Sequence, residues 1–295
     1  MRRFWAIVRT AAVETMSQPL SAILFPVAAL AVHLLPALQY HRFGAPGRLA
    51  RETGLSALFV FGLLFAVPAA VRAIGRELET GTAAAALALG VSRPLYFCAR
   101  LTGVLTVFAL FFASVVAASA VSSFSCVKAA SIFSESGVVR VWGPAFAAGV
   151  CGALAPFAVA AFLNRFFGRR FCLWTCLLTL AFQLPGLAFS GAPGPLPHLL
   201  ALLPAYGMLA VACVAYVAMA GALATRLNSG GVTACLAAAV LVGFLFPLKP
   251  LVPDMRLFWL GEGDPFLPLP LVAGVLLAVL WMLLGCVSLE GKELS

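Results

Sequence analysis

The chain has 295 residues, of which 63% are hydrophobic and only 10% are charged. So few charges cannot keep a domain of this size in solution, so the composition excludes a water-soluble protein and predicts an integral membrane protein. The formal net charge of +9 comes from Lys and Arg residues scattered in ones to threes between apolar runs. Because they form no basic stripe, we expect no nucleic-acid partner.

Residues 1–18 are predicted to form an amphipathic helix in the membrane interface rather than a cleavable signal peptide. The apolar stripe comprises Trp5, Val8, Ala12 and Met16, and the polar stripe comprises Arg3, Thr10, Glu14 and Ser17. Trp5 and the arginines are expected at the level of the lipid headgroups. An ordinary amphipathic lead-in that only anchors the chain is the alternative interpretation.

Eight apolar runs follow, each about as long as the roughly 20 residues that a helix needs to cross a bilayer. They cover residues 19–38, 54–74, 100–121, 142–162, 171–190, 199–225, 230–248 and 268–287. The predicted fold class is therefore an all-α, polytopic transmembrane bundle of about eight spans, forming a single domain over residues 1–295. The many prolines and glycines between Gln183 and Pro204 also allow a re-entrant segment, which leaves six or seven spans possible.

The basic residues predict the orientation of the chain in the membrane. With eight spans both ends share one side, and 12 of the 19 Lys and Arg residues fall on that side against 7 on the other. The positive-inside rule therefore predicts a cytoplasmic N-terminus and a multi-pass protein of the cytoplasmic (inner) membrane. Arg42, Arg48 and Arg51, between the first two spans, are exceptions.

The predicted spans carry no Asp, Glu or Lys near their middle, only polar groups such as Gln183, Thr175 and Thr179. Ion-coupled carriers place ionisable residues there, so their absence disfavours such a carrier. His33 is the one titratable exception of note, and an interfacial histidine is preferred over a proton relay. Cys172 and Cys176 are one helical turn apart, but we expect small apolar side chains there rather than a metal site.

Residues 76–93 combine charged residues with residues that start and end helices. Their sequence is R-E-L-E-T-G-T-A-A-A-A-L-A-L-G-V-S-R. Gly81 is expected to break the helix that leaves the second span, with Glu79 on the same face as Arg72. Thr82 is expected to cap a short helix over residues 83–89, and Gly90 to end it. Ser92 is expected to cap the next helix, which has Pro94 in its first turn.

This short helix is predicted to lie parallel to the membrane. Its apolar side, with Leu87, Leu89 and Val91, is expected to dock into a groove of a partner, while Glu77, Glu79 and Arg93 pair with charges at the rim of that groove. A capped turn that contacts only the protein's own helices is the alternative.

The stretch resembles the signature of permease subunits of type 2 (exporter-like) ABC transporters. The matching residues are Arg76, Glu77, Glu79, Gly81, Thr82, Leu87, Val91, Ser92 and Arg93, whereas Ala84 replaces the usual acid and Gly90 the usual proline. The interfacial first helix and the charged tail after the last span are also similar to that family, whose usual number of spans is six.

The resemblance implies that residues 75–98 form a cytoplasmic coupling loop whose short helix sits in a cleft of a separate ATP-binding subunit. It implies a dimer with a second permease copy or a paralogue. The chain has no G-x-x-x-x-G-K-[ST] phosphate loop, so ATP would be bound by the partner, and we expect no cofactor and no catalytic or metal site in this chain. The apolar composition suggests export of a lipid-like or amphipathic substrate; no substrate-binding residue is identified.

Two other classes are weighed against this interpretation. An intramembrane enzyme would need acid clusters for Mg²⁺, an H-E-x-x-H motif or a membrane Ser–His pair. The chain lacks the first two, and only His198 resembles part of the third. A secondary carrier or channel without an ATPase partner is the second candidate.

Overall fold

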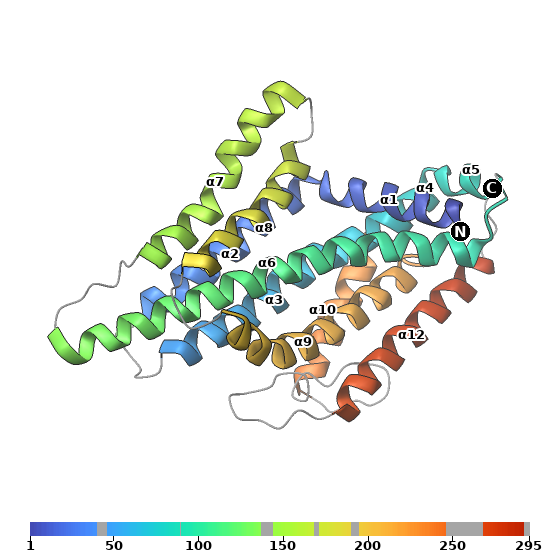
Figure 1. Ribbon diagram of the computed structural model, residues 1–295. Helices are drawn as coiled ribbons and strands as arrows, with labels where there is room; N and C mark the ends of the chain where they lie inside the picture. The colour runs from blue at the N-terminus through green and yellow to red at the C-terminus, as the bar shows by residue number, and fades with distance from the viewer. Residues whose placement is uncertain are drawn as a thin grey trace. The chain divides into compact units, whose positions relative to one another are not determined.

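The computed structural model describes residues 1–39, 46–88, 90–136, 144–167, 171–189, 195–245 and 268–291. Within these ranges the chain consists of α-helices, one π-helical turn and short connecting turns, and it contains no strand (Figure 1). The predicted all-α class is therefore confirmed.

A helix lies at each of the eight predicted spans. The elements are α1 (Arg2–Met16), α2 (Pro19–Gln39), α3 (Pro46–Val71), the π-helix η1 (Arg72–Arg76), α4 (Glu77–Glu79), α5 (Thr82–Ala88), α6 (Arg93–Ser136), α7 (Pro144–Phe167), α8 (Phe171–Phe189), α9 (Pro195–Leu223), α10 (Ser229–Leu245) and α12 (Pro268–Glu290). The largest difference from the prediction is at α6, which extends well beyond residue 121. The charged tail after Gly291 and residues 190–194 of the Pro-rich stretch lie outside the described residues.

Several of these helices have the length and composition of membrane spans. Within the described residues four are long and apolar enough to cross a bilayer, and α1 with α2 would make a fifth if the pair is one broken span. Parts of α7, α8 and α10 are apolar but shorter. Long apolar helices of this kind are typical of a membrane protein.

The chain divides into two compact units. The first contains Met1–Thr15, Leu63–Phe108 and Gly207–Ser295, and the second contains Met16–Gly62 and Ala109–Tyr206. The coupling stretch predicted from the sequence belongs entirely to the first unit.

Glycines allow close helix packing in the core of the first unit. A Cβ atom at Gly221 of α9 would lie 3.0 Å from Ile74 and 3.2 Å from Leu101, both of which are buried. The ring of Phe97 occupies the space next to Gly285 of α12. These contacts place η1, α6, α9 and α12 around one core.

Helix α1 packs on α6 through a face that overlaps the predicted apolar stripe at Val8 but leaves out Trp5. Val8, Ala11 and Thr15 are buried, and a Cβ atom at Gly103 of α6 would lie 2.7 Å from the Val8 carbonyl oxygen. Trp5, predicted in the same stripe as Val8, is 62% exposed. The prediction left Ala11 and Thr15 out of this face because alanine and threonine weigh little in an apolar pattern, yet such small residues permit a close approach to a glycine.

In the second unit α2, α7 and α8 pack on one another. Phe25 of α2 meets Phe111 of α6 edge to face, with ring centroids 5.1 Å apart. The Ser119 and Tyr206 hydroxyls are hydrogen-bonded to each other, and the same Tyr206 hydroxyl donates to the Arg51 carbonyl.

His33, predicted as an interfacial histidine, is buried against α8 within the second unit. It is 2% exposed, and its Nε2 atom lies 3.1 Å from Oε1 of Gln183, which is 1% exposed. The sequence did not predict this pair, because a histidine next to apolar residues has no local signal for a polar partner 150 positions away.

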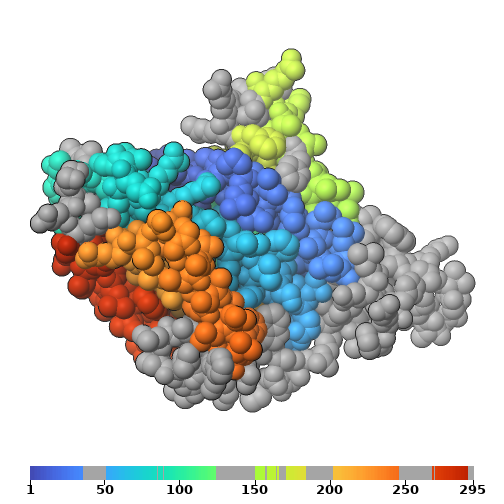
Figure 2. Space-filling view, turned by 180° about the vertical axis from the view of Figure 1, so that it is seen from behind, coloured from blue at the N-terminus to red at the C-terminus, as the bar shows by residue number. Residues whose placement is uncertain are grey.

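The outer surfaces of α10 and α12 are apolar, as lipid-facing surfaces are. Figure 2 shows α12, in red, beside the orange residues of α9 and α10. The exposed large side chains are Leu241, Phe244 and Leu245 on α10 and Val272, Val275, Leu276, Val279, Leu280, Leu283, Leu284 and Val287 on α12. Exposing so large an apolar surface to water would be unfavourable, whereas contact with lipid chains is not.

Candidate functional site

The candidate site is the segment from η1 to the start of α6, which we call the coupling segment (residues 72–93). It gathers at one end of the first unit with α1 and the last turn of α12 (Figure 1). Gly81 has φ 73° and Gly90 has φ 78°, and no other described residue has a positive φ. Because glycine adopts this conformation without a steric cost, the two glycines set both ends of α5. The predicted helix break and stop are confirmed.

The turn before α5 is held by two threonines. The Thr80 hydroxyl donates to the Arg76 carbonyl at 2.9 Å and lies 3.0 Å from the Thr82 hydroxyl. Thr82 in turn donates to the Glu77 carbonyl at 3.3 Å. The Thr82 side chain, predicted as an N-cap of α5, thus bonds back to α4 and fastens α5 to it across Gly81.

The buried Arg100 of α6 links three elements, α1, α4 and α6. The Arg100 side chain is 4% exposed; it forms ion pairs with Glu77 of α4 and, at 3.1 Å, with Glu14 of α1. Its Nε donates to the Glu77 carboxylate at 2.7 Å, and Tyr96 donates its hydroxyl to the same carboxylate. We call Glu14, Glu77, Tyr96 and Arg100 the Arg100 cluster.

The inward position of Glu77 differs from the predicted one. Its side chain is 16% exposed and makes an ion pair with Arg100, whereas Glu79 is exposed. Successive helical residues are rotated by about 100°, so residues two positions apart, such as Glu77 and Glu79, point to nearly opposite sides of the helix. Glu77 and Glu79 therefore do not share a surface, and of these two acids only Glu79 is presented outward.

Arg93 also binds within the chain. It donates to the carbonyl of Glu290 at 2.7 Å and to that of Leu289 at 3.4 Å, at the end of α12. Arg226 donates to the Ser288 carbonyl at 3.1 Å. The last carbonyls of a helix lack partners within the helix and carry partial negative charge, so the two arginines cap α12. Arg93 ties the end of α12 to the start of α6, and Arg226 ties it to the turn that follows α9.

Helix α5 is partly covered by its own chain. Ala83 is 1% exposed, Leu87 and Val91 are half-buried, and Thr82 and Ala88 are exposed. Leu89, predicted on the docking face, lies outside the described residues.

Next to α5, Arg72, Arg76 and Glu79 line a hollow of about 280 Å³ together with Leu227 and Ser229. Arg72 and Glu79 thus share a face, as predicted. Arg72 and Arg76 belong to the π-helical turn, a feature that is frequent at functional sites, and all three charged residues are exposed. This side of the coupling segment offers two guanidinium groups and one carboxylate to the surroundings.

Two thiols give a test of the packing of α6 on α12. The Sγ atoms of Cys98 and Cys286 lie 3.7 Å apart, and a small side-chain rotation brings two sulfurs at this separation to bonding distance. Treatment with diamide, which takes up the two thiol hydrogens, is expected to join these residues within one chain.

Mass spectrometry of digested protein measures the linked peptide. Cys98→Ser provides the control, and its treated peptides are expected to contain no link at Cys286. Linkage between two chains, or no linkage of the wild type, would contradict the packing.

No family model, curated protein or solved structure matches the chain. In the part of the chain that the structure describes, no three His, Cys, Asp or Glu side chains gather as metal ligands would. The candidate site therefore stands on its geometry and on the sequence motif.

The Arg100 cluster is the part of the site that sequence reasoning missed. Glu14 was on the predicted polar stripe, and Arg100 stood at the start of a predicted span, but nothing local connects residues 86 positions apart. The one available signal was the charge itself, because an arginine that enters an apolar span needs an anion.

Proposed function

We propose that the chain is the permease subunit of an ATP-driven ABC transporter of the type 2 (exporter-like) class. The observation that carries this proposal is α5, seven residues long, set between two positive-φ glycines and fastened through Thr82 to α4, which Arg100 in turn links to α1 and α6. A helix held in this way transmits a push at its surface as a rigid-body displacement rather than as local bending.

The proposed partner is a separate ATP-binding subunit that contacts α5 and the hollow beside it. Arg72, Arg76 and Glu79 supply charges for the rim of this contact, and the half-buried Leu87 and Val91 supply its apolar part. ATP is bound by the partner, because the chain carries no phosphate loop. The proposed assembly is a dimer of two permease copies or paralogues, each with about eight spans, in the cytoplasmic membrane with the N-terminus inside.

The proposed cargo is lipid-like or amphipathic and is exported. Its support is compositional, because the exposed and buried surfaces of the spans are both dominated by apolar side chains. A secondary carrier or channel is the second candidate, and the His33–Gln183 pair is the observation that favours it, because a carrier needs polar groups at membrane depth.

The direct test is co-purification of the tagged chain with an ATP-binding subunit from its native membrane. Glu79→Ala and Gly81→Pro are expected to weaken this association or the stimulated ATPase rate, since the first removes the outward acid and the second imposes a negative φ at the break. Gly81→Asn is the matched control, because asparagine tolerates positive φ.

Full coupling in both Glu79→Ala and Gly81→Pro would refute the role of α5. Transport that proceeds with no ATP-binding subunit would instead favour the carrier.

Orientation has its own test. A cysteine introduced at the exposed Ser92 is expected to react with an impermeant maleimide in inverted vesicles and not in intact cells. The measurement is the labelled fraction in the two preparations, made in a background that lacks the half-exposed Cys98. Labelling in intact cells alone would reverse the proposed topology.

A further inference from the structure

The hollow beside α5, which we call the Arg72 hollow, lies entirely within the first unit. Its volume of about 280 Å³ is near the lower end of the range for small-ligand sites, which begins at about 300 Å³. It is therefore large enough for a small polar group but not for a bulky molecule. The lining residues are Val71, Arg72, Gly75, Arg76, Glu79, Leu227 and Ser229.

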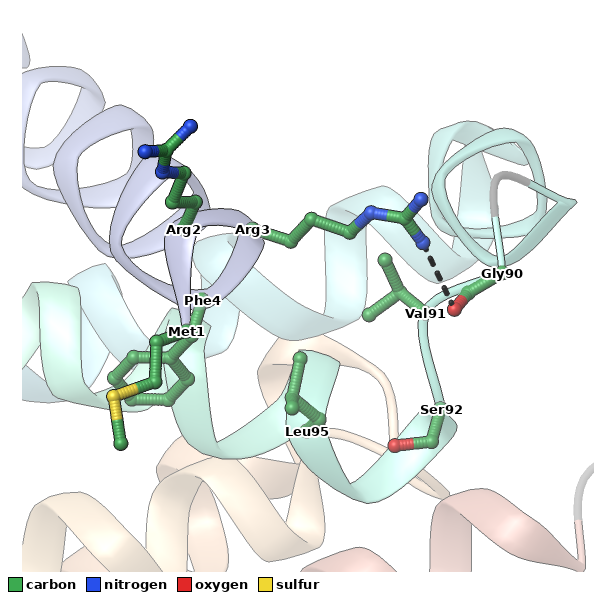
Figure 3. A pocket seen from close by; sticks show the side chains of 8 residues that line it. All are labelled: Met1, Arg2, Arg3, Phe4, Gly90, Val91, Ser92 and Leu95. Carbon is green, nitrogen blue, oxygen red and sulfur yellow. Dashed lines mark hydrogen bonds between the residues drawn. The ribbon is translucent and has the colours of Figure 1, made fainter.

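The charged side chains of the Arg72 hollow have no partner within the described residues. Neither of the two guanidinium groups nor the Glu79 carboxylate makes a side-chain hydrogen bond or an ion pair there, although all three line one space. The start of α1 differs, because the Arg3 side chain extends to Gly90 and donates to its carbonyl at 3.4 Å (Figure 3). Exposed charges of both signs that do not pair with one another are available to a ligand.

The arrangement of these charges indicates a ligand with two opposite charges. Arg72 and Arg76 begin and end η1 and both line the hollow, so a phosphate group between them can accept hydrogen bonds from each. Glu79 repels a simple phosphate ion, but it attracts an ammonium group on the same ligand. A phosphate joined to a primary amine by a short linker therefore matches all three side chains.

The hollow lies at the depth where phospholipid headgroups are found. The uncharged residues 53–71 of α3 extend about 28 Å at 1.5 Å per residue, close to the roughly 30 Å of a bilayer core. Arg72 is the first charged residue after them, so the hollow lies at the edge of that core. Among the sources of an aminoalkyl phosphate, a membrane phospholipid is the one that is concentrated at this depth.

An apolar surface leads away from the hollow along α10. The helix begins at Ser229 in the lining, and its exposed side chains from Ala234 to Leu245 are all apolar. A headgroup in the hollow would therefore leave its acyl chains next to a surface that is suited to contact with lipid.

We propose that the Arg72 hollow binds the headgroup of a phosphatidylethanolamine molecule from the surrounding bilayer. The phosphate lies between Arg72 and Arg76, the ammonium group lies at Glu79, and the acyl chains follow α10. The bound lipid joins η1 to the start of α10, and it competes for these three charges with the proposed ATP-binding subunit. Binding of the lipid needs only the hollow and a membrane, so it does not depend on the ATPase partner.

The test is lipid retention by the purified full chain in detergent, measured by native mass spectrometry with phosphatidylethanolamine and phosphatidylcholine in competition. The two lipids share the phosphate, but only the first has N–H donors on its ammonium group. The wild type is expected to retain phosphatidylethanolamine about threefold better, within the range for one exposed ion pair. Glu79→Gln is expected to remove this preference, and Glu290→Gln, at another exposed acid, is the matched control that keeps it.

The arginines have their own variants. Arg76→Gln is expected to lower retention of both lipids about fivefold, the effect of one basic residue near an anionic lipid surface. Arg9→Gln is the matched control, since Arg9 is exposed but does not line the hollow. Ser229→Trp fills the hollow without changing any charge and is expected to lower retention of both lipids at least as much as Arg76→Gln.

An unchanged lipid preference in Glu79→Gln would overturn the ethanolamine headgroup as the ligand. Equal losses in Arg76→Gln and Arg9→Gln would overturn the site in favour of diffuse surface charge, and full retention by Ser229→Trp would overturn the hollow as the binding place. Complete displacement by millimolar free phosphoethanolamine would overturn the lipid as its occupant. None of these outcomes bears on co-purification of an ATP-binding subunit, so a failure here leaves the proposed function standing.

Discussion

Replacing Arg100 with methionine is expected to lower the free energy of unfolding by about 3 kcal/mol, the loss typical when one partner of a buried ion pair is removed. The Glu77 carboxylate, 16% exposed, would keep the Tyr96 hydroxyl but lose its cation, and Glu14 of α1 would lose its link to α6. Denaturant unfolding of the detergent-solubilised chain measures the change. Arg72→Met, at an exposed arginine, is the control and is expected to change stability by less than about 0.5 kcal/mol.

A second substitution separates the ion pair from the bulk of Arg100. Glu77→Gln in the Arg100→Met background removes the uncompensated charge, so the double variant is expected to be more stable than Arg100→Met alone. Strict additivity of the two substitutions would show that Glu77 and Arg100 do not interact. Under the proposed function, Arg100→Met also uncouples α5 from α1 and α6, so ATPase stimulation falls even where the protein remains folded.

Replacing Gly103 with valine is expected to displace α1 from α6. The new Cβ would lie 2.7 Å from the Val8 carbonyl oxygen and 3.1 Å from the Ala12 nitrogen, and these backbone atoms cannot rotate away as a side chain does. Overpacking of this kind costs about 1–3 kcal/mol. Hydrogen exchange of the α1 amides is the measurement, and faster exchange over residues 5–16 is expected.

Gly207 supplies the control for Gly103. A Cβ atom there has nothing within 4 Å, so Gly207→Ala is expected to leave exchange in α1 unchanged and to stabilise α9 slightly. Normal α1 protection in Gly103→Val would mean that α1 does not pack on α6 through this glycine.

The two large predictions concern the same helix for different reasons. Arg100 binds the C-terminal half of α1 through its ion pair with Glu14. Gly103 lets the middle of α1 pack closely on α6 because it has no side chain. Loss of either contact is expected to expose the coupling segment on the side that faces α1.

Local features of the chain were predictable from the sequence because neighbouring residues decide them. Gly81 and Gly90 end helices through their own backbone freedom, and an apolar run of about 20 residues forms a helix whatever lies beside it. The positions of the helices, the short α5 and the outward Glu79 follow from such local rules. The π-helical turn at residues 72–76 does not, and no signal in the sequence distinguishes it from an α-helical turn.

The direction in which each residue faces was decided by the tertiary structure. Glu77 points inward because its carboxylate binds Arg100 and Tyr96 there. Ala11 of α1 is buried because Gly103 has no side chain to keep α1 away from α6. His33 is buried because its ring contacts the Gln183 side chain. Each of these choices depends on a partner on another helix, and a periodic pattern within one helix cannot contain that information. The sequence by itself determined where the helices begin and end around the coupling segment, whereas the long-range packing of charges and small residues determined which of its side chains remain exposed.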